Sequence, residues 1–402
     1  MRLLVLNSGS SSIKYCVLDM ADESPLFSGK IERIGESDSL FVDRAHFASA
    51  DAQEQIEHRQ VVDHATGLSM IFDRLRDNEA GSEYPFHAAA HRVVHGGGRF
   101  KQPVIIDDSV MEVLEKTIPL APLHNPPSLS GIKVTQRNYP GIRQVAVFDT
   151  SFFASLPARA YRYAIPDRLY REHNIRRFGF HGISHRYVAA ASASYLKRPL
   201  EKLRLITVHL GNGASASAID KGLCIDTSMG MTPTEGLVMG SRCGDLDPSL
   251  HFYLARTAGM GIDEIETMLN NQSGLKGLCG CSDIREVHKL ADAGDERARL
   301  AIDIYCYRVS KYIGAYVTVL GGLDALVYTG GVGENDPVVR QLICDRLSVL
   351  GIALDHKKNN DCTGKAGAIS SDASRAKVVV IPANEELEIA RQTSILLRSH
   401  KT

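Results

Sequence analysis

Short apolar runs alternate with polar turns along the first sixty residues of the chain. Residues 3–6 are apolar and lead into a Ser/Gly-rich turn at residues 7–12, and a second mainly apolar run follows at residues 13–19. Short apolar runs bounded by turn residues are typical of β-strands, so we expect strands up to about residue 62. Apolar residues at helical spacing then predict a helix over residues 66–78.

The same pattern returns half a chain later. Residues 205–210 are mainly apolar, residues 211–215 form a Gly/Ser turn, and the next run ends at Asp220, as the first pair of runs ends at Asp19. Strands are expected over residues 203–227, a long helix over 297–320 and a closing helix over 385–397. The order of strands followed by helices occurs twice in the sequence. This indicates a duplicated α/β scaffold of two domains with a cleft between them.

Both Gly/Ser turns have the chemistry of phosphate-binding turns. They expose backbone N–H groups and hydroxyls without bulky side chains, and Lys14 supplies a cation after the first turn. A third apolar run, residues 323–329, breaks into a Gly-rich loop at 330–335 that precedes a helical pattern from Pro337. The alternative for the first two turns is a pair of ordinary hairpins. A Walker motif is absent, and a dinucleotide fold is disfavoured because the first turn opens another strand.

Composition and charge exclude several classes of protein. The chain has 402 residues, of which 44% are hydrophobic and 23% charged, and its net charge is −1. This length favours two domains, and this charge offers no field to attract nucleic acid or an anionic membrane. The first apolar segment becomes polar at Asn7, too early for a signal peptide, and no run of about 18 apolar residues follows. We therefore expect a cytoplasmic protein whose eight cysteines are reduced thiols.

Five short segments concentrate His, Arg and Asp beside glycine or proline. They span residues 91–98, 121–126, 147–150, 176–182 and 240–245. Charged loops are ordinarily just solvated, but five of them beside three candidate phosphate turns favour an active site. His95 and His124 are interpreted as core histidines slightly more readily than as phosphoryl contacts. His181 and His185 have the i, i+4 spacing of metal ligands, but the Glu of the HExxH motif is missing.

At these residues the chain resembles the acetokinase family, which comprises acetate and propionate kinases and belongs with sugar kinases, actin and the heat-shock ATPase chaperones. The resemblance covers essentially the whole chain. It is carried by residues 7–14, 209–213, 226–233, 239–242 and 384–386, which arrive in the family's order. It implies two actin-like, ribonuclease H-like domains with duplicated βββαβα-type cores. Residues 1–151 with 386–402 would form the N-terminal domain, and residues 152–385 the nucleotide-binding domain.

The resemblance also implies an activity. The family catalyses the reversible, Mg²⁺-dependent transfer of the γ-phosphoryl group of ATP to acetate, giving acetyl phosphate and ADP, and Mn²⁺ is an alternative metal. A homodimer without nucleic-acid or membrane partners is implied as well. The alternatives are a propionate kinase of the same family or, in a different class, an ATP-gated actin-like or chaperone-like binding protein. The binding protein would lack the concentrated Arg and His residues between the phosphate turns.

Roles follow for named positions from the resemblance. Asp149, His181 and Arg242 are implied as catalytic residues, and Asn7 and Glu385 as the pair associated with magnesium. Arg92 is implied as the clamp on the acyl carboxylate, with Val94, Leu123, Phe180 and Pro233 around the methyl group of the acceptor. The implied nucleotide and phosphate contacts are Ser12, Lys14, His209, Leu210, Gly211, Asn212, Gly213, Asp283, Ile284, Arg285, Gly330, Gly331, Val332, Gly333 and Glu334.

Physical chemistry leads to similar roles. Transfer of a phosphoryl group to a carboxylate brings two anions together, so the site needs cations around the equatorial oxygens. Arg92, Arg242, His181 and magnesium suit this purpose. A simple carboxylic acid is already ionised at pH 7, so the nucleophile needs no general base. Asp149 is therefore expected to position magnesium or water rather than to accept a proton.

Overall fold

A computed structural model describes residues 1–46, 53–78, 86–122 and 124–400. By contacts, the chain divides into an N-terminal unit, Met1–Ser151 with Asn384–Thr402, and a C-terminal unit, Phe152–Ala383. The N-terminal unit resumes at Asn384, two residues before the expected start at 386. The Asn384 side chain accepts a hydrogen bond from the Leu387 N–H at 3.0 Å and so caps the last helix. Asn384 and Glu385 therefore belong to the N-terminal unit.

The N-terminal unit is built on an eight-stranded sheet with the order β5-β4-β3-β2-β1-β6-β8-β7. Its strands are β1 (Arg2–Ser8), β2 (Ser12–Asp19), β3 (Ser24–Glu32), β4 (Ser39–Ala45), β5 (Gln53–Arg59), β6 (Ala88–Val93), β7 (Val104–Ile105) and β8 (Arg143–Phe148). Its helices are α1 (His64–Asn78), α2 (Asp108–Lys116), α3 (Asn125–Asn138) and α15 (Glu385–Ser399), with 3₁₀ turns η1 (Ile118–Leu120) and η2 (Asp149–Ser155), the latter running into the next unit.

The C-terminal unit is built on a six-stranded sheet with the order β11-β10-β9-β12-β14-β13. Its strands are β9 (Arg204–Leu210), β10 (Ala214–Asp220), β11 (Leu223–Thr227), β12 (Ala325–Thr329), β13 (Gly367–Ala368) and β14 (Lys377–Val380). Its helices are α4 (Ala158–Tyr161), α5 (Asp167–His173), α6 (Gly182–Tyr195), α7 (Ser249–Thr257), α8 (Ile262–Asn271), α9 (Gly274–Cys279), α10 (Ile284–Asp292), α11 (Glu296–Leu320), α12 (Gly330–Asn335), α13 (Pro337–Asp345) and α14 (His356–Asp361), with 3₁₀ turns η3 (Leu200–Lys202) and η4 (Ser348–Leu350).

The two sheets share one plan. In the first, β3-β2-β1 are antiparallel neighbours and β1-β6-β8 are parallel neighbours. In the second, β11-β10-β9 are antiparallel and β9-β12-β14 are parallel. The duplicated α/β scaffold expected from the two Gly/Ser turns is thereby confirmed. Each of those turns joins the first two strands of its sheet.

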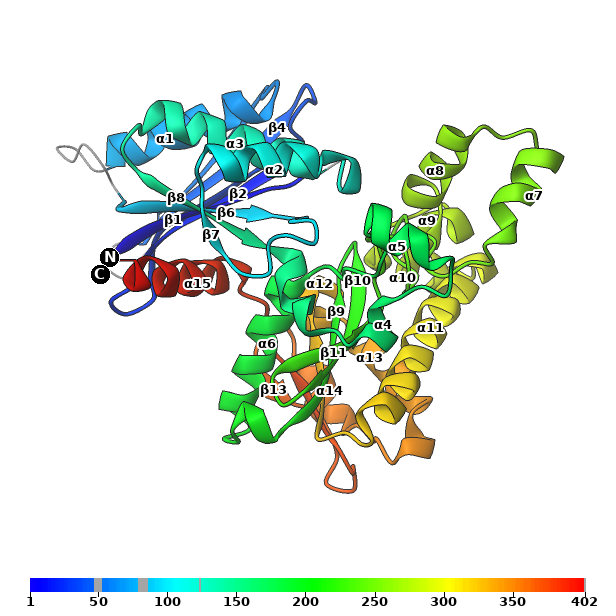
Figure 1. The fold of residues 1–402 in the computed structure, drawn as a ribbon. Coiled ribbons are helices and arrows are strands. Elements are labelled where there is room, and N and C mark those ends of the chain that lie inside the picture. The colour runs from blue at the N-terminus through cyan, green and yellow to red at the C-terminus, as the bar shows by residue number, and fades with distance from the viewer. Residues whose placement is uncertain (47–52, 79–85, 123, 401–402) are drawn as a thin grey trace. The chain divides into compact units, whose positions relative to one another are not determined.

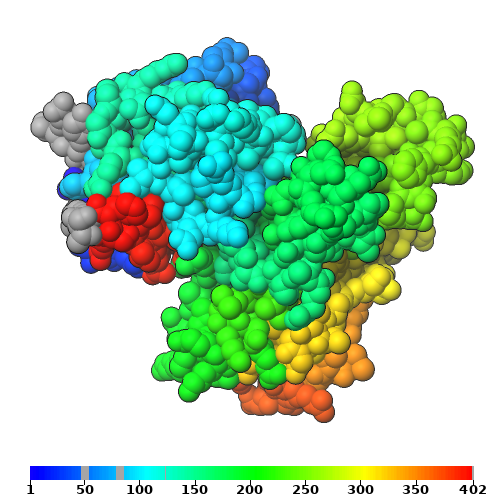
Figure 2. Space-filling model, viewed as in Figure 1, coloured from blue at the N-terminus to red at the C-terminus, as the bar shows by residue number. Residues whose placement is uncertain are grey.

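Helices cover both faces of each sheet. In the N-terminal unit, α1 and α3 lie over one face and α15 over the other (Figure 1). Leu4 and Leu6 of β1 pack in the core cluster beneath α1, so the alternation of a strand turns Leu3, Val5 and Asn7 towards the α15 face. Part of α15 stays on the surface of this unit, as the red atoms of Figure 2 show. The chain thus brings Asn7 and the start of α15 to the same face.

In the C-terminal unit, α6 and α11 both contact the sheet and flank it on different sides (Figure 1). Ala189 and Ala193 of α6 pack on Leu205 and Ala325 of the sheet. The long helix predicted over 297–320 is α11, and a buried stripe from Ala298 to Leu320 fixes its orientation. Within the described residues, no helix is both long and apolar enough to cross a membrane.

Candidate active site

Oxygen-bearing side chains converge on Arg92 in the N-terminal unit. The Arg92 Nε and Nη2 atoms lie 3.2 and 2.5 Å from the two carboxylate oxygens of Asp149, and Nη1 lies 3.0 Å from the amide oxygen of Asn7. The Glu385 carboxylate is 3.8 Å from Nε. Because β1, β6 and β8 run parallel, residues near their carboxyl ends meet at one edge of the sheet. Glu385, the first residue of α15, joins them there.

The electrostatics of this cluster keep Arg92 charged. Burial alone would lower the pKa of the guanidinium, but the carboxylates of Asp149 and Glu385 raise that pKa above its usual value. Asp149 is 1% exposed, and its carboxylate makes a two-pronged contact with Arg92. One of the two edges of Arg92 that can grip a carboxylate bidentately, the Nε/Nη2 edge, therefore already holds a carboxylate of the protein. Sequence reasoning did not foresee this pair.

The same cluster has the donor atoms that magnesium prefers. Mg²⁺ takes oxygen ligands and is commonly held by one or two carboxylates together with substrate phosphates and water. Asn7 and Glu385 offer an amide oxygen and a carboxylate, both near the guanidinium of Arg92. Their chemistry fits the metal that the sequence implies.

Other predicted residues of this unit lie nearby in the fold. Lys14 pairs with Asn7 in the register of β1 and β2, and Ser12 begins β2. Val94 directly follows β6 and is 5% exposed. Leu123, predicted to contact the acceptor, lies outside the described residues.

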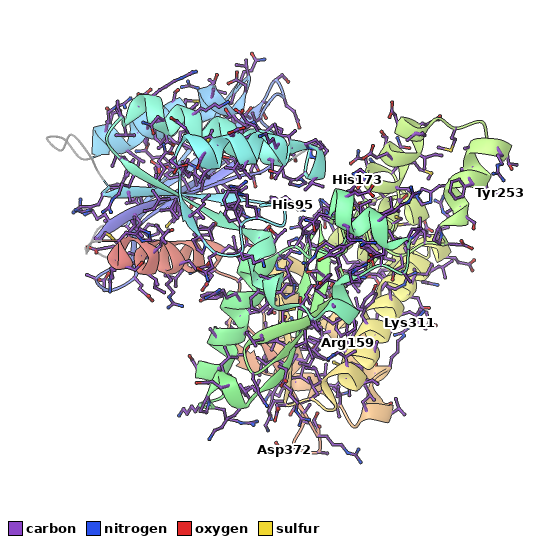
Figure 3. All side chains as sticks on the ribbon, in the orientation of Figure 1. His95, Arg159, His173, Tyr253, Lys311 and Asp372 are labelled. Atoms are coloured by element: carbon purple, nitrogen blue, oxygen red, sulfur yellow. The ribbon has the colours of Figure 1, made fainter. Side chains whose placement is uncertain are left out.

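The structure places His95 and His124, the two histidines interpreted as core residues or phosphoryl contacts, at different points of this unit. His95, labelled in Figure 3, is fully buried, and its Nδ1 accepts a hydrogen bond from the Gly97 N–H at 2.9 Å. Burial lowers its pKa to about 4, so the ring is neutral at pH 7. His124 precedes the first residue of α3.

In the C-terminal unit, two of the predicted phosphate turns lie side by side. The turn Gly211–Gly213 follows β9 and is closed by a hydrogen bond from the Gly211 N–H to the Gly213 carbonyl at 3.0 Å. Thr329, the last residue of β12, pairs with His209 of β9. Gly330 follows with a φ of +77°, and a Cβ there would lie 2.7 Å from the Leu210 carbonyl oxygen. Glycine is required at this close approach.

His181 and Arg242 meet at the first of these turns. A Cβ placed on Gly213 would lie 3.3 Å from Nε2 of His181 and 3.4 Å from Nη1 of Arg242. Arg242 also donates from Nη1 to the Pro233 carbonyl at 3.2 Å, and burial lowers the pKa of its guanidinium. Phe180 is buried directly before His181. The glycine turn, an arginine and a histidine thus form one polar group that suits an anion.

A cavity of about 640 Å³ extends from the glycine turns within the C-terminal unit. Seven of the predicted nucleotide contacts line it, namely Gly211, Asn212, Asp283, Ile284, Arg285, Gly331 and Val332. The other lining residues, which are Gly240, Leu275, Ser282, Tyr305, Asn335 and Asp336, were not predicted as nucleotide contacts, although Gly240 and Asn335 lie in the predicted segments 240–245 and 330–335. Only the fold brings these positions together. Asn335 and Asp336 could have been noticed from the sequence, because they precede Pro337 and so mark the start of a helix.

The loop expected at residues 330–335 is a short helix, α12, and Glu334 closes it. The Glu334 Oε1 atom accepts hydrogen bonds from the Gly330 N–H at 2.8 Å and the Ala383 N–H at 3.0 Å. The side chain of Glu334 therefore binds the protein's own backbone. Gly333 faces inward in the same way, since its carbonyl accepts from Arg340 at 2.9 Å.

Arg340 is a fully buried guanidinium that anchors α12. It donates to the carbonyls of Gly333, Glu334, Asn359 and Cys362 and to the Asn359 side chain, over 2.8 to 3.0 Å. Arg340→Met should lower the free energy of unfolding by about 3–4 kcal/mol, because several buried carbonyls lose their donor. Urea unfolding checks this. Arg346→Met, on the surface pair with Asp303, is the control and should cost under about 1 kcal/mol. Equal losses in both variants would contradict the prediction.

Comparison with known proteins identifies the family. The model of the acetokinase family matches residues 2–391. An acetate kinase of Syntrophobacter fumaroxidans is 48% identical over 99% of this chain and 97% of its own, and one of Thermotoga maritima is 48% identical over 98% of both. Among solved structures, Porphyromonas gingivalis acetate kinase matches with a TM-score of 0.90 and 42% identity over 98% of this chain and 99% of its own. A propionate kinase of Francisella tularensis matches with a TM-score of 0.91 and 41% identity over 97% and 98%. The chain is therefore a kinase that belongs to the acetokinase family.

Proposed function

We propose that this kinase transfers the γ-phosphoryl group of ATP reversibly to acetate, giving acetyl phosphate and ADP. The observation that carries the proposal is the grouping of His181 and Arg242 at the Gly211–Gly213 turn, beside a cavity lined by the predicted nucleotide contacts. A phosphoryl group in flight spreads negative charge over three equatorial oxygens, and preorganised donors stabilise that charge most where water is excluded.

Each side chain then has a distinct task. Arg242 and His181 donate to the equatorial oxygens, and the backbone N–H groups of the glycine turn hold the phosphates of the nucleotide. Asn7 and Glu385 would hold Mg²⁺, which would neutralise charge on the phosphates. Asp149 orients this region through Arg92. The acetate carboxylate is ionised at pH 7, so no residue has to remove a proton from it.

Arg92 recognises the acetate carboxylate in this proposal. A guanidinium offers five N–H donors. The contacts to Asp149 and Asn7 use three of these donors, one on each nitrogen. The positive charge of Arg92 is held in place by Asp149, so acetate meets a cation that is already oriented. Preorganisation of this kind lowers the cost of binding a small anion.

We assign the size of the acceptor to Val94, which the resemblance implies lies at the methyl group of the acceptor. Val94→Ala should narrow or reverse the preference for acetate over propionate, which we expect to be about tenfold in kcat/KM in the native enzyme, because one methylene in an apolar pocket is worth about 1–3 kcal/mol. Steady-state kinetics with both acids measure the ratio. Val93→Ala is the control, because Val93 packs in the cluster with Leu114 and Phe148. A native preference for propionate would contradict the acetate assignment and favour a propionate kinase.

The reaction itself is tested by trapping its product. Hydroxylamine should convert the product to an acyl hydroxamate when ATP, Mg²⁺ and acetate are supplied, and removal of Mg²⁺ with EDTA should abolish the signal. An ATP-gated binding protein would release phosphate from ATP without forming hydroxamate, which would refute the proposal.

We further propose that the enzyme is a homodimer, as its resemblance to the family implies. Sedimentation velocity of the purified protein, without nucleotide and at micromolar concentration, measures this directly. A single species of about twice the 43.9 kDa chain mass is expected, and a monomer would contradict the assembly without bearing on the reaction.

A further inference from the structure

A chain of hydrogen-bonded side chains runs behind His181 within the C-terminal unit. His181 Nδ1 lies 3.0 Å from Ser215 Oγ, and Ser215 Oγ lies 2.7 Å from Nε2 of His185. His185 Nδ1 lies in turn 2.7 Å from Thr207 Oγ1. His181 and His185 are one turn apart at the start of α6, whereas Thr207 and Ser215 lie on the neighbouring strands β9 and β10. The helix and the sheet are therefore joined by four polar side chains in a row.

The inner part of this row is sealed from solvent. Thr207, His185 and Ser215 are each 0% exposed. Burial, and to a smaller extent the neighbouring ring of His209, lowers the pKa of His185 well below its usual value, so this ring is neutral. A neutral imidazole has one N–H donor and one acceptor nitrogen, and a serine hydroxyl has one proton to donate. The protons in the row must therefore all point in one direction or all in the other.

The end of the row at Thr207 selects the direction. Among the residues that the structure describes, Thr207 Oγ1 has a single hydrogen-bonding partner, Nδ1 of His185. If His185 carried its proton on Nδ1, the buried Thr207 hydroxyl would accept a hydrogen bond from that N–H. The hydroxyl proton of Thr207 would then have no acceptor. If Thr207 donates instead, Nε2–H of His185 donates to Ser215, and the Ser215 hydroxyl donates to Nδ1 of His181. Only the second arrangement uses every buried donor, and buried donors are rarely left unused.

We propose that Ser215 and His185 are positioning residues that hold His181 as the neutral tautomer with its proton on Nε2. That nitrogen lies on the side of the ring that faces the Gly211–Gly213 turn and Arg242. His181 also adopts a left-handed backbone conformation, with a φ of 58°, and stacks on His209 with ring centroids 4.4 Å apart. Its ring is thus fixed by backbone, stacking and hydrogen bond together.

The consequence rests on the proposed function. With its proton on Nε2, His181 presents a donor to the phosphoryl oxygens without having to be an imidazolium. In the other tautomer it would present a lone pair to an anion, which is repulsive. Ser215 thus acts on the reaction through His181 and need not touch the substrate.

Nitrogen NMR of the histidines tests the tautomer without relying on activity. The protein is labelled with ¹⁵N-histidine, long-range ¹H–¹⁵N spectra are recorded at pH 8, and the His181 and His185 signals are assigned with His181→Asn and His185→Asn. We expect both rings to carry the proton on Nε2 and a bare Nδ1. A proton on Nδ1 of either ring, as the other tautomer or as an imidazolium, would overturn the proposal.

Kinetics test the positioning role. Ser215→Ala should lower kcat about tenfold, the low end of what losing an orienting partner of a functional histidine costs, and leave the KM of ATP and acetate within about twofold. Ser215→Thr, which keeps the hydroxyl, should recover most of kcat. The control is Ser192→Ala, a buried hydroxyl of α6 that donates to the Val188 carbonyl at 2.6 Å. Wild-type kcat in Ser215→Ala would overturn the positioning role.

Failure of the underlying function gives a different result. Full activity in His181→Ala would refute the catalytic role of His181. It would leave the tautomer measured by NMR in the native protein unaffected. If Ser215→Ala does not fold, the spectra of the native protein still decide the proposal.

Discussion

Arg242→Ala should lower kcat by about 100- to 1000-fold, because removal of one preorganised donor to developing negative charge has a cost of that size. Arg242 is suited to this role because it stands at the Gly213 turn beside His181 and is held by the Pro233 carbonyl. Initial rates at saturating ATP and acetate measure the effect, and circular dichroism establishes that the variant is folded.

Arg308→Ala is the matched control for this prediction. Arg308 is also partly buried and also donates to backbone carbonyls, those of Gly236 and Asp245, at 3.3 and 3.2 Å. It lacks the position at the glycine turn, so its loss should lower kcat less than about tenfold. If Arg242→Ala retained half of the wild-type rate, the assignment of Arg242 to the phosphoryl group would be wrong.

Arg92→Ala should raise the KM for acetate by roughly 10- to 100-fold while changing the KM for ATP little, because a charged hydrogen bond contributes about 1.5–3 kcal/mol. It should also lower the free energy of unfolding by about 3–5 kcal/mol, because the substitution breaks the ion pair between Arg92 and the buried Asp149. Steady-state kinetics and urea unfolding measure the two effects separately.

A second substitution separates recognition of acetate from stability. Arg92→Lys keeps the positive charge beside Asp149 but loses the planar fork, so it should recover part of the stability and little of the acetate affinity. An acetate KM that stays at the wild-type value in both variants would show that the carboxylate is bound elsewhere.

The repeated strand order of the two sheets could be predicted from the sequence because the first two strands of each sheet and the turn between them are contiguous in the chain. A strand, a Gly/Ser turn and a strand that ends in Asp19 or Asp220 are contiguous in the chain, and the structure joins β1 to β2 and β9 to β10 at those turns. The long helix α11 was equally visible, since its buried positions recur at helical spacing.

Contacts between distant segments could not be predicted in this way. The pairing of Arg92 with Asp149 depends on the alignment of β6 with β8, and the row from Thr207 to His181 depends on how α6 lies on β9 and β10. Glu334 was predicted as a nucleotide contact because it lies in the Gly-rich segment 330–335. Its inward contacts with Gly330 and Ala383 follow from the helical turn that the loop adopts.

The central claim is that a carboxylate oxygen of acetate attacks the γ-phosphorus of ATP. Phosphorus NMR with ¹⁸O-labelled acetate, ATP and Mg²⁺ tests this most directly. Attack by the carboxylate places one ¹⁸O between carbon and phosphorus, so the acetyl phosphate signal should appear with the isotope shift of a single ¹⁸O bonded to phosphorus. Formation of only ADP and unlabelled inorganic phosphate, with no acetyl phosphate signal, would contradict the account.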